Sequence, residues 1–191
     1  LHKFSEFKRA NVDRPVAPVI KSNAYGHGLL PVAKTLANSL TDDDAPFFVV
    51  DSYFEALSLR ENGIKKKLLI IGYTPPSTIV QSMLKDVSFT ITSLDALQEL
   101  DSLLISSRPQ LAQKPSIHLK IDTGMRRQGI MLNEIESALK SASRVTLEGI
   151  CSHFADADNP ESLFTNEQIE SWNLLVRKIR SKIPSLAYWH I

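Results

Sequence analysis

Short apolar runs alternate with longer amphipathic stretches along most of this chain. Continuous apolar runs are typical of strands buried in a parallel sheet, whereas apolar positions three and four residues apart indicate helices. The runs predict about seven strands, over residues 16–21, 47–50, 68–71, 88–92, 117–121, 147–153 and 186–191. The amphipathic stretches predict helices over residues 31–40, 53–62, 76–85, 94–105, 132–142 and from 165 to the proline at 184.

Residues that favour helix ends support several of these boundaries. Pro31 suits the first position of a helix, where no backbone N–H is needed. Ser52 is expected to cap the next helix, with Glu55 completing a capping box. Thr165 and Gln168 have the same spacing and predict the start of the longest helix.

The regular alternation of strands and helices predicts an α/β fold with a parallel sheet and right-handed crossovers. About seven strands is one fewer than the eight of a (β/α)8 TIM-type barrel of ~250 residues, and an open doubly wound sheet also accommodates them. We favour a barrel that is incomplete on its C-terminal side, because the chain ends without a helix to cover its last strand. Residues 1–191 are therefore expected to form one incomplete barrel domain, with residues 41–44 and 106–115 as solvated loops.

Composition narrows the class of protein. The 191 residues include 22 Lys and Arg against 21 Asp and Glu, and no basic stripe with interleaved aromatics, so a nucleic-acid partner is not expected. No apolar run approaches the ~20 residues of a membrane span, so no membrane partner is expected either. A single cysteine, Cys151, excludes an internal disulfide and suits a reducing compartment such as the cytoplasm.

The first candidate for chemistry is Lys21, which ends an apolar run just before a turn that contains Gly26 and Gly28. Active sites of α/β folds lie at the carboxyl ends of their strands. An amine in that place can form a Schiff base with an aldehyde cofactor, provided that partial burial lowers its pKa. Taken alone, a lysine in this place is more often a surface lysine at the end of a strand.

Three further stretches place ionisable residues near predicted strand ends. Lys120 alternates out of phase with Leu119 and Ile121, so it faces a different side of its strand and needs an anionic partner or a modification. His153 follows another strand, and no second histidine stands at ligand spacing, so no metal site is expected there. His190 ends the last predicted strand.

Residues 21–28, Lys-Ser-Asn-Ala-Tyr-Gly-His-Gly, resemble the motif of alanine racemases whose lysine carries pyridoxal 5′-phosphate (PLP). The resemblance implies that Lys21 bears PLP and acts as one of two catalytic bases. It also implies that Tyr25 contacts the cofactor phosphate, while we interpret His27 as a structural residue of the loop. Ser22 departs from the family, which usually has alanine there.

Residues 118–129 resemble a second signature of the same family. The resemblance implies that Lys120 is carbamylated and braces Arg127, which reaches the region of the cofactor phenolic oxygen and the substrate carboxylate. The family usually has glycine at the position of Arg126 and leucine at that of Gln128.

The resemblance also assigns roles to the two histidines at strand ends. It implies that His153 packs against the PLP ring, and that His190 supports an arginine beyond Ile191 that faces the pyridine nitrogen. In the family, a C-terminal β domain follows the barrel, and the second base is a tyrosine from the partner subunit of a homodimer. We therefore expect interconversion of L-alanine and D-alanine, which supplies D-alanine for peptidoglycan, and little or no activity from these 191 residues alone.

Three other functions stay open at this point. A PLP-binding homeostasis protein is a lone barrel that carries the cofactor without racemase activity. A racemase of broader amino-acid specificity would share the same motifs. A barrel that binds a phosphorylated small molecule without PLP would use Lys21 only as a phosphate contact.

Overall fold

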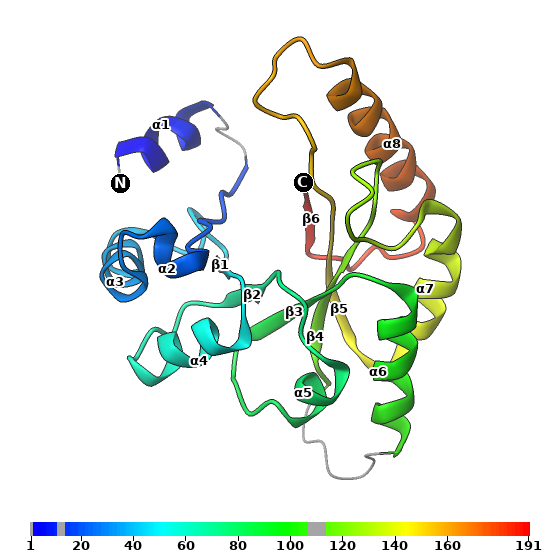
Figure 1. Ribbon diagram of the computed structural model, residues 1–191, viewed down its shortest axis with the longest axis horizontal. Helices are drawn as coiled ribbons and strands as arrows, with labels where there is room; N and C mark the ends of the chain where they lie inside the picture. Colours follow the sequence, from blue (N-terminus) through cyan, green and yellow to red (C-terminus); the bar gives the residue numbers. More distant parts are fainter. Residues whose placement is uncertain (1, 11–13, 107–113) are drawn as a thin grey trace. The chain divides into compact units, whose positions relative to one another are not determined.

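The computed structural model describes residues 2–10, 14–106 and 114–191. They fall into two compact units, one comprising Leu1–Thr74 with Ser82–Phe89 and the other Pro75–Gln81 with Thr90–Ile191. Figure 1 labels their helices and strands. Most of the predicted loop at 106–115, namely residues 107–113, lies outside the described residues.

Three parallel strands form the centre of the first unit. Strand β1 (Phe48–Val50) pairs with β2 (Leu68–Ile70), which pairs in turn with the first three residues of β3 (Val87–Ile91). Every residue of the three strands is buried. Burial on both faces explains why these strands appear in the sequence as continuous apolar runs rather than as an alternating pattern.

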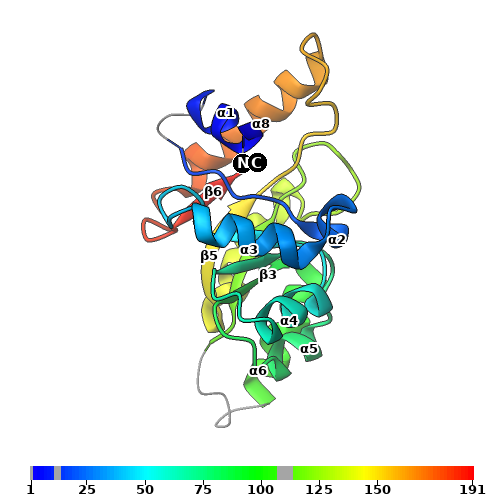
Figure 2. The ribbon, with the colours of Figure 1, turned by 90° about the vertical axis from the view of Figure 1, so that its left-hand side faces the viewer.

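The helices of the first unit either precede β1 or lie between β1 and β2. The helices of the first unit are α1 (His2–Ala10), α2 (Lys21–Tyr25), α3 (Leu29–Ser39) and α4 (Tyr53–Glu61). Figure 2 shows α3 and α4, which contact each other. Helix α3 begins two residues earlier than predicted, so Pro31 occupies its third position, where a missing N–H is still tolerated.

The predicted strand at 16–21 is wrong: only an isolated bridge joins Val19 to Val49. The Ile20 amide donates to the Val49 carbonyl at 2.8 Å, and the Val49 amide donates to the Pro18 carbonyl at 2.9 Å. Pro18 itself has no backbone N–H to donate, so the ladder does not extend toward the N-terminus. The segment before Lys21 is therefore tied to β1 over only a few residues.

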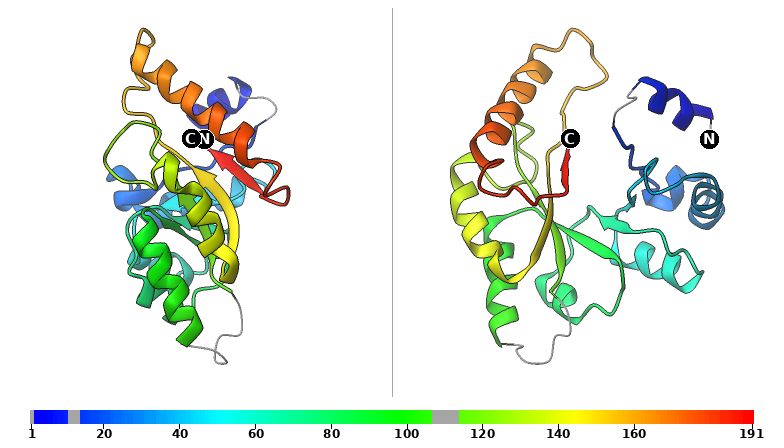
Figure 3. Two further views of the ribbon diagram at one scale, coloured as in Figure 1. Left: turned by 90° about the vertical axis from the view of Figure 1, so that its right-hand side faces the viewer. Right: turned by 180° about the vertical axis from the view of Figure 1, so that it is seen from behind.

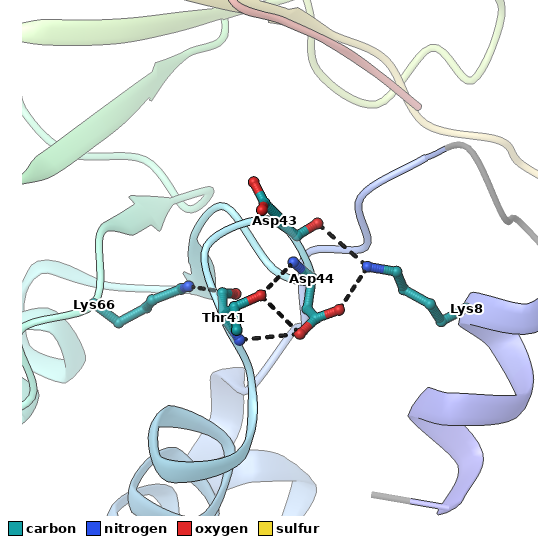
Figure 4. Close-up of polar contacts among 5 residues, drawn as sticks. All are labelled: Lys8, Thr41, Asp43, Asp44 and Lys66. Carbon is teal, nitrogen blue, oxygen red and sulfur yellow. Dashed lines mark hydrogen bonds and ion pairs between the residues drawn. The ribbon is translucent and has the colours of Figure 1, made fainter.

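The acidic segment at residues 41–44 is a largely exposed turn, as predicted, and it also makes polar contacts with Lys8 and Lys66 (Figure 4). The Asp44 carboxylate accepts hydrogen bonds from Lys8 Nζ at 2.8 Å and from the Thr41 backbone amide at 3.0 Å. Lys66 Nζ donates to the Asp42 carboxylate at 2.6 Å. The hydrogen bond from Lys8 is the main reason that the pKa of Asp44 is lowered to about 2.

The second unit also has parallel strands in chain order. Strand β4 (Ser116–Lys120) pairs with β5 (Thr146–Cys151), and β5 pairs with β6 (Tyr188–His190). Its α-helices are α5 (Pro76–Gln81), α6 (Leu94–Ser106), α7 (Ile135–Ser141) and α8 (Leu163–Ile179). Figure 3 shows α6, α7 and α8. Short 3-10 turns, η1 (Leu132–Glu134) and η2 (Ala142–Arg144), flank α7.

Helix α8 begins before the predicted capping box. Ser162, not Thr165, is its N-cap, and the Ser162 hydroxyl accepts from the Thr165 amide at 3.2 Å. Gln168 is fully buried. Its side chain is bonded to the segment that follows β5, so it is not available for a capping box.

No helix among the described residues is long and apolar enough to cross a membrane.

Candidate active site

Lys21 opens a left-handed helical turn, α2, rather than ending a strand. Its four successors, Ser22 to Tyr25, all have φ between 52° and 55°. A left-handed helix costs about 1–2 kcal/mol for each residue that carries a Cβ. Strain of this kind persists only where the surrounding contacts determine the conformation, and it is concentrated at functional sites.

Hydrogen bonds inside the segment close the turn. The Ala24 amide donates to the Ile20 carbonyl at 3.0 Å, and the Gly28 amide donates to the Asn23 carbonyl at 2.9 Å. The Asn23 side-chain oxygen accepts from the Leu29 amide at 2.8 Å, where α3 begins. Asparagine tolerates this backbone region better than most residues, which fits its place at the centre of the turn.

Contacts with β1 and α4 fix the turn from outside. Ile20 is bonded to Val49 on one side of Lys21. On the other side, the Asn23 amide donates to Glu55 Oε1 at 3.2 Å, while Glu55 Oε2 accepts from the Asp51 amide at 2.8 Å. The backbone of Lys21 is therefore held between two anchored residues.

Except for the buried Ala24, the side chains of this turn are at least partly exposed. Lys21 is partly exposed, and Tyr25 is 63% exposed. No hydrogen bond or ion pair joins the Lys21 ammonium to any residue in the described ranges. His27 is exposed as well. The interpretation of His27 as a structural residue of the loop is therefore wrong, because its side chain is not packed into the turn.

In the second unit, Lys120 is the last residue of β4 and lies opposite Cys151. The loop that follows is closed by a bridge between Ile121 and Ile130. Inside it, the buried Asp122 carboxylate accepts from the Gly124 amide at 2.7 Å and from the Arg126 amide at 3.1 Å. A carboxylate that receives two backbone amides stabilises the loop locally.

The backbone at Arg126 and at Gly129 adopts positive φ, a conformation that favours glycine. Arg126 has φ of 53°, a region that glycine adopts without a Cβ penalty, and it is the position where the family usually has glycine. At Gly129, with φ of 145°, a Cβ would lie 2.6 Å from the Asp122 amide nitrogen. Arg127, the arginine singled out by the sequence, is exposed on this loop.

One histidine of β4 and one of β6 form a hydrogen-bonded pair. His118 Nδ1 and His190 Nε2 are 2.9 Å apart, so one ring nitrogen donates and the other accepts. The His118 ring stacks on Tyr188 with centroids 5.7 Å apart and interplanar angle 19°. Burial lowers the pKa of His190 to about 4, so this imidazole is neutral at pH 7.

Sequence reasoning missed His118, although a signal was present. His118 and Lys120 lie two residues apart on one strand, so they share a face by the period of two. Gly149 is the register partner of His118, and a Cβ there would lie 2.5 Å from His118 Nδ1. The glycine therefore makes room for the imidazole ring.

His153 follows β5 at the start of a loop held by buried polar side chains. Its side chain is exposed, and its backbone carbonyl accepts from Gln168 Nε2 at 3.0 Å. The side-chain oxygen of Gln168, Oε1, accepts from the Ala155 amide at 2.9 Å, and the hydroxyls of Thr123 and Ser152 are 2.8 Å apart. Within the described ranges, no three His, Cys, Asp or Glu side chains are grouped to hold a metal ion.

The structure thus combines a parallel α/β fold with a lysine held at a strained turn. Residues 2–191 match the family described as "Alanine racemase, N-terminal domain". The chain therefore belongs to the alanine racemase family, through its N-terminal domain.

Individual relatives agree with this assignment. The chain is 39% identical over 197 residues to alanine racemase 2 of Caldanaerobacter subterraneus subsp. tengcongensis, covering 100% of this chain and 48% of that protein. It is 36% identical over 192 residues to alanine racemase of Carboxydothermus hydrogenoformans, covering 99% and 50%. The chain thus spans about half the length of the curated relatives it matches.

Solved structures confirm the fold. Alanine racemase of Clostridium difficile 630 in complex with cycloserine superposes with a TM-score of 0.83 at 29% identity, covering 98% of this chain and 51% of that one. The α/β fold therefore corresponds to part of the parallel barrel of alanine racemases, not to an open doubly wound sheet, and the chain matches about half of the longer structure.

Proposed function

We propose that this chain is the cofactor-binding part of a PLP-dependent racemase that interconverts L-alanine and D-alanine. The observation that carries the proposal is the left-handed turn that holds Lys21 between two anchored residues, in a chain that belongs to the racemase family. The proposal includes action in the cytoplasm and supply of D-alanine for peptidoglycan.

The residues of the first unit fit the cofactor. An aldehyde cofactor needs an amine that is not already engaged, and the Lys21 ammonium has no bonded partner in the described ranges. A phosphate needs hydrogen-bond donors, and the Tyr25 hydroxyl is accessible on the same turn. These two side chains would hold PLP.

When bound, PLP withdraws electrons from the amino-acid Cα and so makes the proton on that carbon removable. Lys21 would accept or return this proton on one face of the substrate, as a base whose backbone is fixed beforehand. Tyr25 would donate a hydrogen bond to the phosphate and so orient the bound group.

The second unit would supply the remaining contacts of this chain. Arg127 would bind near the substrate carboxylate, where a guanidinium pairs well with a planar anion. A carbamate on Lys120 would convert a cation into an anion that orients Arg127. His153 would pack against the cofactor ring, and His190 would support an arginine beyond Ile191.

The proposal also includes a second domain and a second subunit. Relatives about twice as long as this chain support a C-terminal β domain in the full-length protein. We expect that domain to supply the opposite base, a tyrosine, to the active site of the partner in a homodimer.

The test uses the full-length protein that contains this chain. Borohydride reduction followed by mass spectrometry should find a pyridoxyl adduct on Lys21, and a coupled assay should detect D-alanine formed from L-alanine. An adduct without D-alanine would favour the homeostasis protein. Turnover of other amino acids at comparable rates would favour a broader racemase, and the absence of an adduct would favour a barrel that does not use PLP.

A further inference from the structure

The carboxylate of Glu55 joins three parts of the first unit. Its Oε1 atom accepts from the Asn23 amide at 3.2 Å, inside the turn that follows Lys21. Its Oε2 atom accepts from the Asp51 amide at 2.8 Å, just beyond β1. The residue itself belongs to the first turn of α4.

This arrangement differs from the capping box that the sequence predicts. Half of the box is present, because the Ser52 hydroxyl accepts from the Glu55 amide at 3.2 Å. In a complete box, the glutamate side chain would return to the backbone amide of the capping residue. Here the carboxylate receives the amides of Asn23 and Asp51 instead.

The bonded amide lies in a backbone that needs outside support. Asn23 has φ of 55° and ψ of 41°, in the middle of four left-handed residues. Amide hydrogen bonds to an ionised carboxylate are stronger than those to a neutral acceptor. Ile20 is anchored to Val49, so Glu55 supplies the second of the two points that hold Lys21.

We infer that Glu55 is a positioning residue, which holds the left-handed turn in place and so sets where the Lys21 amine stands for reaction with PLP. Glu55 acts through the backbone of Asn23 and touches neither cofactor nor substrate. The inference rests on the proposed function, because its consequence concerns the reaction of Lys21 with PLP.

The chain offers variants that separate positioning from stability. Glu55→Ala removes both acceptors, and Glu55→Gln keeps one acceptor oxygen but places a side-chain amide NH2, a donor, opposite the second backbone amide. Ser52→Ala removes the cap of the same helix but leaves the carboxylate, so it reports a loss of helix stability alone. Glu61→Gln removes an exposed carboxylate at the end of α4 as a matched control.

The first measurement is hydrogen exchange in the PLP-free full-length protein. The Asn23 and Ala24 amides should exchange faster in Glu55→Ala than in wild type, since the turn loses its outside anchor. Ser52→Ala and Glu61→Gln should leave their exchange unchanged. This readout does not depend on cofactor binding, so it tests the anchor even if the proposed function is wrong.

The second measurement is the PLP concentration that gives half-maximal adduct on Lys21 after borohydride reduction. Glu55→Ala should raise it about tenfold or more, with Glu55→Gln between Glu55→Ala and wild type. If Glu55→Ala fails to fold, Glu55→Gln carries the test.

Two results would overturn the inference with the proposed function intact. One is wild-type exchange and wild-type adduct formation in the Glu55 variants. The other is an equal loss of adduct in Ser52→Ala at a matched melting temperature. A wild-type protein that forms no Lys21 adduct at any PLP concentration would overturn the proposed function itself.

Discussion

In the first unit, the turn after Lys21 is anchored by Glu55, which lies 32 residues from Asn23 in the chain. In the second unit, the loop after Lys120 is anchored by Asp122, which lies two residues from Gly124. Both carboxylates receive two backbone amides, and both segments contain residues with positive φ. The first segment depends on a neighbouring helix, whereas the second is fixed by its own side chain.

This difference predicts how each segment responds to change. The loop after Lys120, which is anchored by its own Asp122, should tolerate substitutions in other elements of its unit but not substitutions of its own residues. A turn anchored from a distance should respond to changes in α4 as well as to its own residues. The variants below test this contrast, from the largest expected effect to the smallest.

Removal of the Lys21 amine should have the largest effect on activity. Lys21→Ala in the full-length protein should lower racemisation by about 10³-fold or more, because the proposed function makes Lys21 both one of two bases and the covalent link to the cofactor. Loss of D-alanine formation and of the pyridoxyl adduct should occur together. Racemisation near the wild-type rate in this variant would rule out the role proposed for Lys21.

Two glycine substitutions compare the segments directly. Gly129→Ala should destabilise the protein by about 2–4 kcal/mol, since its Cβ would collide with the Asp122 backbone at φ of 145°. Gly26 has φ of 89°, but an added Cβ would meet open space there, so Gly26→Ala should destabilise the protein by only about 1 kcal/mol. Urea unfolding of the full-length variants measures both, and equal losses would contradict the contrast.

The histidine pair gives the second unit a pH dependence. The pKa of His190 is about 4 in the folded chain because of burial, below the unfolded value of 6.5. The unfolded state therefore binds more protons between these values, so stability is full above pH 6.5 and falls as pH drops toward 4. The loss should reach at most about 3 kcal/mol.

Unfolding of wild type and His190→Gln at several pH values measures this effect. The variant should be less sensitive to pH between 6.5 and 4, although it is less stable at pH 7. An identical slope in the two proteins would show that another group is responsible.

Relief of backbone strain should give the smallest effect. Arg126→Gly places glycine at φ of 53° and keeps the amide that donates to Asp122. Stability should rise by up to about 1 kcal/mol, less the greater entropy of glycine in the unfolded chain. Calorimetry of the full-length variant would detect this, and a marked fall in melting temperature would mean that the Arg126 side chain stabilises the loop.

Sequence reasoning predicted what depends on local pattern. The buried strands were found because continuous apolar runs such as that of β2 (Leu68–Ile70) have few other interpretations. The Ser52 cap was found because its side chain bonds within three residues.

What depends on long-range contact was not predictable. The hydrogen bond from the Asn23 amide to Glu55 joins two elements that are far apart in the sequence, so no local sequence pattern predicts it. The left-handed turn could not be predicted from sequence either. Four successive residues other than glycine rarely adopt positive φ, so no known sequence pattern indicates such a run. Gln168 matched a helix-start pattern, yet burial against the loop after β5 decided its role.

The bond between Glu55 and Asn23 has a consequence for synthesis on the ribosome. A nascent chain folds from its N-terminus as residues emerge, and the residues around Lys21 emerge well before Glu55 does. Until that glutamate is available, the Asn23 amide lacks the carboxylate that bonds it in the left-handed turn. The Lys21 amine thus reaches its final setting only after α3, β1 and the first turn of α4 have been made.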